Sequence, residues 1–174
     1  MDCSRIPSVE DIENLEARGP WKTKSKGDLT VLLAIPLTTV LNRFLVYDPE
    51  ELAKIPQDIC GLRLYPVRNL PKGESGGGEF HRVRKEFFFG LDGKILMTCD
   101  DLYGGTRSFM ITPDFGIYIP NFIRHSYVVM EERSGFLVIA NTLFIPDNPR
   151  THDTYKTEEF ELLKMKTEER RHEK

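Results

Sequence analysis

The most informative part of the chain is the stretch Gly73-Glu74-Ser75-Gly76-Gly77-Gly78-Glu79-Phe80-His81-Arg82-Val83-Arg84-Lys85-Glu86. Three side chains in it, Glu79, His81 and Glu86, follow one another at intervals of two and five. Residues i and i+2 of a strand face the same side, so Glu79 and His81 are expected to point together, either into the interior or out to solvent. The preceding glycines permit the tight entry that an interior site needs.

Short strand candidates follow one another along the chain around this stretch. Turn-forming pairs such as Asp92-Gly93 and Gly104-Gly105 separate them. The seven candidates are residues 62–67, 86–91, 95–98, 108–112, 116–119, 126–130 and 136–140. Many short strands with such turns are typical of a sandwich or a closed antiparallel barrel. The sequence therefore predicts an all-β fold, and the number of strands fits a jelly roll.

A second segment brings another histidine to the expected site. It reads Gly116-Ile117-Tyr118-Ile119-Pro120-Asn121-Phe122-Ile123-Arg124-His125. A strand and a proline turn precede His125, so this histidine is expected to close the site from a neighbouring strand.

The two segments together resemble the paired motifs of the cupins. The first cupin motif has a glycine, a His-x-His pair, a glutamate and a second glycine at fixed spacing. That spacing is kept here by Gly73, Glu79, His81, Glu86 and Gly93, with Glu79 in the place of the first histidine. The second motif fits at Pro120 and His125, whereas Phe122 stands where a glycine is usual. The resemblance implies a jelly-roll barrel with its site inside.

A closer resemblance is to the nucleotide-sugar 3,4-ketoisomerase family of cupins, also described as WxcM-like C-terminal domains. Residues 76–93 and 116–125 register without a gap with the family stretches Arg-Gly-x-His-Ala-His-Lys-x-x-x-Gln and Gly-Leu-Tyr-Val-x-Pro-x-x-Trp-His. The similarity extends over residues 61–160. It implies a homodimer that binds a sugar or nucleotide-sugar at the barrel mouth and needs no cofactor.

Several family positions are altered in this chain. The family has a tyrosine before the motif, an arginine and a first histidine, and the corresponding residues here are Arg68, Gly76 and Glu79. The family glutamine is replaced by Glu86, and the tryptophan before the final histidine by Arg124. The second histidine, His81, is retained. These changes leave the predicted fold intact and leave the reaction open.

The leading hypothesis is a divergent sugar isomerase or epimerase that works by proton transfer. Moving a carbonyl between neighbouring sugar carbons needs a base and an acid, and Glu79 and His81 are the expected catalytic pair. The expected substrate-binding residues are Arg68, Tyr118, Arg124 and His125. The two arginines would hold a diphosphate or stabilise an enediolate, and the tyrosine would stack on a sugar or base.

Two alternatives use the same residues differently. A metal-dependent cupin enzyme would bind manganese, iron, nickel or zinc through Glu79, His81, Glu86 and His125, two carboxylates and two imidazoles. A non-catalytic sugar-binding cupin would account for the missing family tyrosine, arginine and first histidine.

The remainder of the chain is divided by composition into three parts. Residues 1–60 are expected to hold a short helix over 8–18, two buried strands within 29–47 and a helical connector at 48–53, packing on the barrel or at a dimer interface. Residues 61–160 form the predicted jelly roll, and residues 161–174 a charged tail that is helical or frayed.

The composition points to a globular protein of the cytoplasm. The 174 residues suffice for one domain, and a formal net charge of −3 gives no general attraction to nucleic acid or to an anionic membrane. No signal segment or membrane anchor is visible in the sequence. The three cysteines, Cys3, Cys60 and Cys99, form no CxxC pair, so neither a disulfide framework nor a thiolate zinc site is expected.

Overall fold

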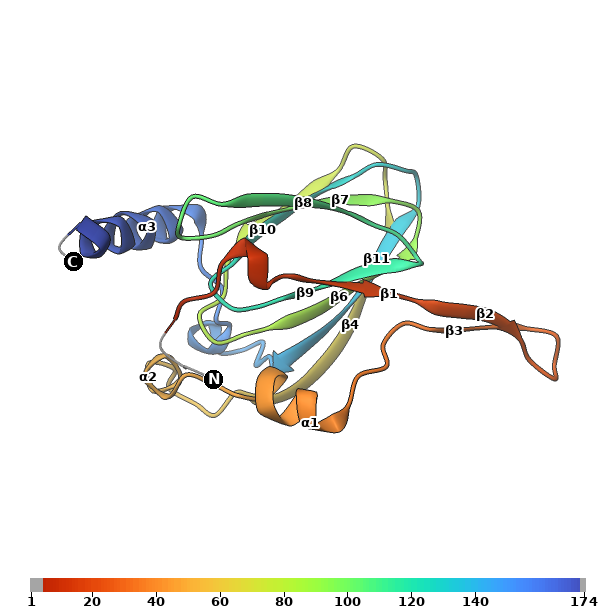
Figure 1. Cartoon of the computed structure of the whole chain (residues 1–174), viewed down its shortest axis with the longest axis horizontal. Helices are drawn as coiled ribbons and strands as arrows, with labels where there is room; N and C mark the ends of the chain where they lie inside the picture. Colours follow the sequence, from red (N-terminus) through yellow and green to blue (C-terminus); the bar gives the residue numbers. More distant parts are fainter. Residues whose placement is uncertain (1–4, 173–174) are drawn as a thin grey trace.

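Two antiparallel sheets face each other in the computed structural model, which describes residues 5–172 (Figure 1). The five-stranded sheet has the order β1-β9-β6-β11-β4 and the four-stranded sheet the order β5-β10-β7-β8. The strands are β1 (Glu13–Glu16), β4 (Cys60–Leu70), β5 (Ser75–Glu79), β6 (Glu86–Asp92), β7 (Ile95–Asp100), β8 (Thr106–Ile111), β9 (Phe115–Ile119), β10 (Arg124–Val129) and β11 (Ser134–Thr142). The predicted jelly-roll barrel is confirmed. Five of the seven predicted strands lie within one of these elements, and the other two, 108–112 and 126–130, extend one residue beyond β8 and β10.

The central strand β6 is buried on both faces, and this explains its run of three phenylalanines. Phe88 points between the sheets and stacks on Phe136 of β11, with ring centroids 4.4 Å apart. Phe87 and Phe89 point to the outer face of the sheet, where Phe44 covers them. Because side chains alternate along a strand, Glu86 shares the inward face with Phe88. The residue that begins β6 therefore carries a carboxylate into the barrel.

The N-terminal segment differs from its prediction. The capping box of Ser8 and Asp11 is present, but the helix is one 3-10 turn, Val9–Asp11, and does not extend to residue 18. The chain continues as β1, which pairs with β9 at the edge of the five-stranded sheet. Hydrogen bonding to this edge outweighs the weak helical spacing of three apolar residues.

The two buried strands predicted within residues 29–47 are also wrong. One exposed strand, β3 (Asp28–Val31), is followed by the helical turns α1 (Leu37–Thr39) and η2 (Val40–Phe44), the latter a π-helical turn. Apolar side chains of this segment pack on the outer face of the large sheet. The apolar run thus covers the sheet as helical turns and loop rather than joining it.

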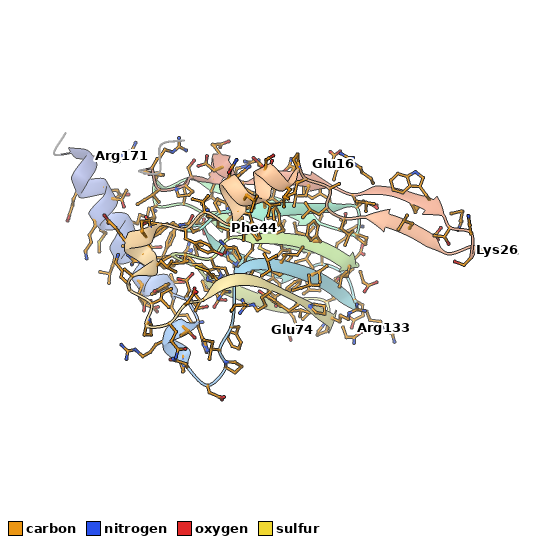
Figure 2. The ribbon with its side chains drawn as sticks, turned by 90° about the horizontal axis from the view of Figure 1, so that it is seen from below. Glu16, Lys26, Phe44, Glu74, Arg133 and Arg171 are labelled. Carbon is orange, nitrogen blue, oxygen red and sulfur yellow. The ribbon has the colours of Figure 1, made fainter. Side chains whose placement is uncertain are left out.

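A two-stranded ribbon of β2 (Arg18–Lys22) and β3 projects from the barrel, with Lys26 at its tip (Figures 1 and 2). Trp21 and Leu29 lie opposite each other in its register, and they are 49% and 50% exposed. A pocket of about 370 Å³ lies at its base, lined by residues 14–18 and 31–35. The ribbon therefore has almost no core of its own.

Helical elements lie at the ends of the barrel. The predicted connector is present as α2 (Pro49–Leu52), where the Asp48 side chain accepts from the backbone N–H groups of Glu50 and Glu51. A 3-10 turn, η3 (Pro149–Thr151), precedes α3 (Thr157–His172), which projects from the opposite end to the ribbon (Figure 1). Phe160 anchors α3 against Phe80, Leu102 and Phe122.

Candidate functional site

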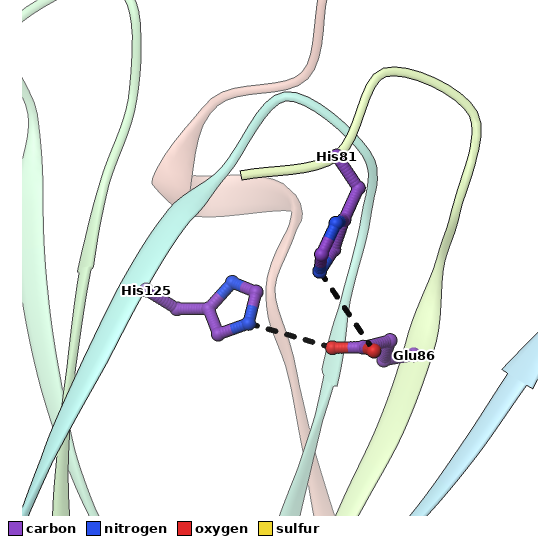
Figure 3. Close-up of side chains that lie close together, drawn as sticks. All are labelled: His81, Glu86 and His125. Atoms are coloured by element: carbon purple, nitrogen blue, oxygen red, sulfur yellow. Dashed lines mark ion pairs between the residues drawn. The ribbon is translucent and has the colours of Figure 1, made fainter. Parts of the chain in front are cut away.

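Three buried side chains meet inside the barrel (Figure 3). The Nε2 atom of His125 lies 3.5 Å from one Glu86 carboxylate oxygen, and the Nε2 atom of His81 lies 3.9 Å from the other. His81 and Glu86 are each 3% exposed and His125 is 8% exposed. The sequence placed all three in the candidate site, and the structure brings these three together.

The two sheets supply the site from facing sides. Glu86 begins β6 in the five-stranded sheet, and His125 lies near the start of β10 in the four-stranded sheet. The backbone of His125 is approached so closely by Gly77 of β5 that a Cβ there would lie 2.6 Å from the His125 carbonyl oxygen. The φ of Gly77 is +79°, so the glycine is needed both for space and for conformation.

His81 lies in the segment that crosses from β5 to β6, and the C-terminal part of the chain holds it there. Its Nδ1 atom donates to the Asp153 carbonyl at 2.7 Å. The Asp153 carboxylate accepts three backbone N–H groups of the crossing segment, from Arg82, Val83 and Arg84, at 2.7–3.1 Å. These bonds fix the segment that carries the imidazole.

Arg84 is a central member of the site that the sequence analysis missed. Basic residues in alternation, here Arg82 and Arg84 followed by Lys85, are typical of an exposed strand face, yet Arg84 is 6% exposed. Its guanidinium lies 3.3 Å from His81 Nε2 and 3.4 Å from a Glu86 oxygen. It also donates to the His152 carbonyl and the Thr154 hydroxyl. Arg84 lies two residues before Glu86, so strand alternation predicts that both side chains face the same side. This spacing is the signal by which the sequence could have placed Arg84 in the site.

The hydrogen bonds fix the protonation of His81. A carbonyl only accepts and a guanidinium only donates, so Nδ1 carries the proton and Nε2 is left as an acceptor. Burial lowers the pKa of His81 well below 6.5, and the positive charge of Arg84 and the nearby His125 lower it further. His81 is therefore a neutral imidazole of defined tautomer.

His125 faces the Glu86 carboxylate through its Nε2 atom, 3.5 Å away. The Nδ1 atom of His125 donates to the Ile123 carbonyl, which leaves Nε2 facing the Glu86 carboxylate. An unprotonated Nε2 and a carboxylate are both acceptors, so a proton or a cation between them is required for attraction. The neutral His81 therefore lies beside an imidazole and a carboxylate that face each other.

Arg63 and Tyr65 of β4 complete the wall of the site, and the sequence analysis missed both. The Tyr65 hydroxyl donates to the Glu86 carboxylate at 3.4 Å, and burial raises the pKa of Tyr65. The Arg63 guanidinium lies over the rings of Tyr65 and Phe144, 5.0 and 5.2 Å from their centroids. The strand alternation of residues 62–67 could have placed both on one face.

Glu79 and Arg68 lie apart from these residues. The Glu79 carboxylate pairs with Lys156 Nζ at 3.4 Å, and it is not among the histidine and carboxylate atoms that lie within 4.8 Å of one another. The strand β5 ends at Glu79, so the alternation that would align it with His81 does not continue. Arg68 is exposed on β4, out of phase with Arg63 and Tyr65.

Tyr118 and Arg124 also point elsewhere. Tyr118 packs on the outer face of the large sheet against Phe87 and under the Arg43 guanidinium, and burial raises its pKa to about 12. Arg124 pairs with Asp100 at 2.9 Å and with Glu161 at 3.2 Å. Of the four expected substrate-binding residues, His125 alone lies in the described site.

The donor set suits a transition metal in type and spacing but not in charge. Two imidazole nitrogens and a carboxylate lie within 4.8 Å, and both histidines are oriented through Nδ1 by backbone carbonyls, as metal-binding histidines often are. Arg84 donates to two of the same donor residues, and its positive charge opposes a dication at this place.

A double-sheet barrel with an imidazole and carboxylate cluster inside defines a cupin-type protein. A family model, FdtA, described as WxcM-like, C-terminal, matches residues 44–159. The chain belongs to this family. No curated protein matches the sequence.

Solved structures agree with the fold. One is QdtA, a sugar 3,4-ketoisomerase from Thermoanaerobacterium thermosaccharolyticum in complex with TDP, 15% identical, with 93% of this chain and 98% of that chain covered and a TM-score of 0.61. A second is the WlaRB TDP-quinovose 3,4-ketoisomerase from Campylobacter jejuni, 15% identical, with 87% of this chain and 98% of that chain covered and a TM-score of 0.60. A third is a dTDP-4-dehydrorhamnose 3,5-epimerase from Bacillus anthracis, 12% identical, with 86% of this chain and 82% of that chain covered and a TM-score of 0.60. Within residues 5–172, no helix has the length and apolar character needed to cross a membrane.

Proposed function

We propose that the protein is a nucleotide-sugar isomerase or epimerase that transfers protons at the site of His81, Glu86 and His125. Supporting this are the family match and the likeness to solved ketoisomerases and an epimerase acting on TDP-linked sugars. The observation that carries the proposal is the neutral imidazole of His81 beside the facing carboxylate and imidazole of Glu86 and His125.

The proposed reaction moves a proton between carbons next to a sugar carbonyl. For isomerisation, His81 Nε2 takes the proton from the carbon that carries the neighbouring hydroxyl, and the bonding pair shifts onto the carbonyl oxygen to give an enediolate. The hydroxyl proton passes to that oxygen as the new carbonyl forms, the pair of Glu86 and His125 donates a proton to the former carbonyl carbon, and His81 returns its own proton to that pair. For epimerisation, the donated proton reaches the original carbon from the other face. Arg84 already lies beside His81 Nε2, so it is placed to stabilise the enediolate oxygen. Protons and electrons balance without a redox cofactor.

The test is turnover of TDP-4-keto-6-deoxy sugars, and of UDP-linked counterparts, followed by NMR in deuterated water. Deuterium should enter at the carbon next to the carbonyl as product forms. His81→Asn keeps a donor for the Asp153 carbonyl but lacks the base, so it should lose at least about 100-fold of the rate. Ligand-dependent stabilisation without any exchange or conversion would instead support a non-catalytic sugar-binding cupin.

A second candidate is a metal-dependent cupin enzyme, favoured by the three donor residues within 4.8 Å. His81, Glu86 and His125 would hold the ion, which would polarise a carbonyl or a bound water. Freshly purified, untagged protein should then contain near-stoichiometric manganese, iron, nickel or zinc by elemental analysis. A His81→Ala, His125→Ala variant should contain none. Protein that is free of metal and refuses added metal contradicts this candidate.

We propose further that the protein forms a homodimer through its β2–β3 ribbon. A two-stranded ribbon is marginally stable alone, and Trp21 and Leu29 are half-exposed on it. The edge strand β4 also exposes Leu62 and Leu64, at 58% and 63%. In a dimer with a twofold axis, the ribbon of each chain would lie against the edge strand β4 of the other chain. Both exposed apolar surfaces would then be covered.

A further inference from the structure

Three buried polar atoms within residues 5–172 have no hydrogen-bond partner. They are Arg63 Nε, Arg84 Nε and Thr142 Oγ1. Native proteins pair nearly all such atoms, because burying an unpaired polar group costs free energy. One buried polar atom without a partner can have a purely local cause. Three such atoms in the same barrel indicate a shared cause.

Strand pairing places the three side chains near one another. Arg63 of β4 and Glu86 of β6 both pair with Ala140 of β11, from opposite sides. Thr142 follows two residues after Ala140 and pairs with Cys60 of β4, across a shift in the register, and Arg84 lies two residues before Glu86 and contacts its carboxylate. The three residues therefore come from neighbouring positions along β4, β11 and the start of β6.

The local charge is positive. Arg63 and Arg84 contribute two guanidiniums, and the pKa of Arg63 is lowered by burial and then by the charge of Arg84. Glu86 supplies one carboxylate, whereas the nearby Asp153 carboxylate is occupied by backbone N–H groups. Two buried cations with a single shared anion are unfavourable unless a second negative group joins them.

We propose that Arg63, Arg84 and Thr142 form a binding subsite for an oxyanion. Guanidinium N–H groups and a hydroxyl suit phosphate and carboxylate oxygens, and the half-buried Arg63 is the member of the cluster nearest to solvent. The proposed subsite extends the proposed function. It rests on that function for one point only, which is that the substrate presents a phosphoryl or carboxylate group beside the reacting carbons. The diphosphate of a nucleotide-sugar and the carboxylate of a sugar acid share this chemistry.

Calorimetry and thermal unfolding of the full chain test the subsite directly. Inorganic pyrophosphate, TDP and glucuronate are titrated into the wild type, and the tightest of them identifies the source of the oxyanion. Arg63→Met keeps an apolar stem under Phe144 but removes the charge. The affinity for the preferred anion should fall at least about tenfold, as expected for a lost charge-assisted hydrogen bond.

The same variant gives a second readout that a purely structural arginine would not. Without anion, Arg63→Met should melt at or above the wild-type temperature, because repulsion with Arg84 is relieved. With saturating anion the order should reverse, because only the wild type gains the full binding energy. Thr142→Val, which keeps the shape of the side chain, should weaken the anion about fivefold.

The exposed Arg133, in the turn before β11, provides the matched control. Arg133→Met should change neither the affinity nor the anion-dependent shift. Equal anion affinity in the wild type and Arg63→Met, or no stabilisation by any of the three anions, overturns the subsite. Anion binding without turnover of any nucleotide-sugar would leave the subsite standing and count against the proposed reaction. Turnover of a nucleotide-sugar without Arg63-dependent anion binding would support the proposed reaction and overturn the subsite.

Discussion

Glu86 and Glu79 carry the same carboxylate in different surroundings. Glu86 is 3% exposed between two histidines, whereas Glu79 forms a partly exposed pair with Lys156. We expect Glu86→Gln to lower turnover at least about 100-fold, because the proton shared with His125 is lost. Glu79→Gln, which tests the pair predicted from the sequence, should lower it less than about tenfold. The rate constant for deuterium exchange into the sugar measures both.

A larger loss in Glu79→Gln than in Glu86→Gln would restore the assignment made from the sequence. Circular dichroism and thermal unfolding of both variants serve as the control, since a misfolded protein would lose turnover for another reason.

The depressed pKa of His81 makes stability depend on pH. The unfolded chain takes up a proton near pH 6.5 and the folded site does not. The contribution of the neutral His81 to the free energy of unfolding is therefore fully present above about pH 6.5. It is lost as the pH falls from there towards the pKa of the folded state, by up to about 1.4 kcal/mol per pH unit. His81→Asn should show a shallower decline of the free energy of unfolding between about pH 7 and pH 5.

Urea unfolding at several pH values measures this slope. Glu86, His125, Arg63 and Arg84 face His81 and are the same in both proteins, so the difference in slope isolates the imidazole. Parallel declines in the two proteins would show that His81 titrates normally in the folded state.

The sequence predicts the His81, Glu86 and His125 site because motif spacing and strand parity are local signals. It does not place Glu79, because alternation holds only while a strand continues and β5 ends at that residue. Arg84 was hidden for a different reason. Its spacing to Glu86 was a local signal, but two of its partners are the carbonyl of His152 and the hydroxyl of Thr154, and contacts across such a separation leave no local pattern.

Among the elements, the crossing segment between β5 and β6 depends on Asp153. Its carboxylate accepts from Arg82, Val83 and Arg84, and an amide has only one accepting oxygen. Asp153→Asn should therefore lower the free energy of unfolding by about 1–3 kcal/mol. The φ of Asp153 is +47°, a conformation that asparagine also tolerates, so backbone strain should not contribute.

Urea unfolding measures the loss, and the exposed Asp147→Asn is the matched control. An effect no larger than that of the control would mean that the crossing segment is held by its other contacts, such as the bridge between Phe80 and Tyr155.

The elements confirmed from the sequence are those with strong turn signals on both sides. The strand β4 and the strands from β6 to β11 follow this rule. The N-terminal segment does not, because the free edge of β9 and the outer face of β6 determine what it forms. Apolar content there predicts burial, but the shape of the surface to be covered decides between strand and helical turn.

At the scale of the whole molecule, the β2–β3 ribbon is the surface through which the homodimer is proposed to form. Trp21→Ser with Leu29→Ser removes both apolar side chains from one cross-strand pair without touching the barrel. The wild type should elute as a dimer and the double variant as a monomer in size-exclusion chromatography with light scattering. The barrel itself should keep its fold, since the ribbon contributes almost nothing to the cores.

A matched change at the opposite end, Leu162→Ser with Met165→Ser on α3, removes two similarly exposed apolar side chains and should leave the dimer intact. A wild type that is monomeric at about 50 μM would contradict the assembly, since stable dimer interfaces hold at far lower concentrations.

The carbonyl of Asp153 is the acceptor that fixes the proton of His81, and the carbonyl of His152 holds Arg84. Both come after β11, which ends at Thr142 and is the last strand of the two sheets along the chain. A nascent chain that has emerged only to Thr142 therefore possesses every strand of both sheets but an imidazole whose tautomer is not yet defined. The architecture is complete before this histidine is positioned, and the stretch of chain translated after β11 supplies the carbonyl that defines its protonation.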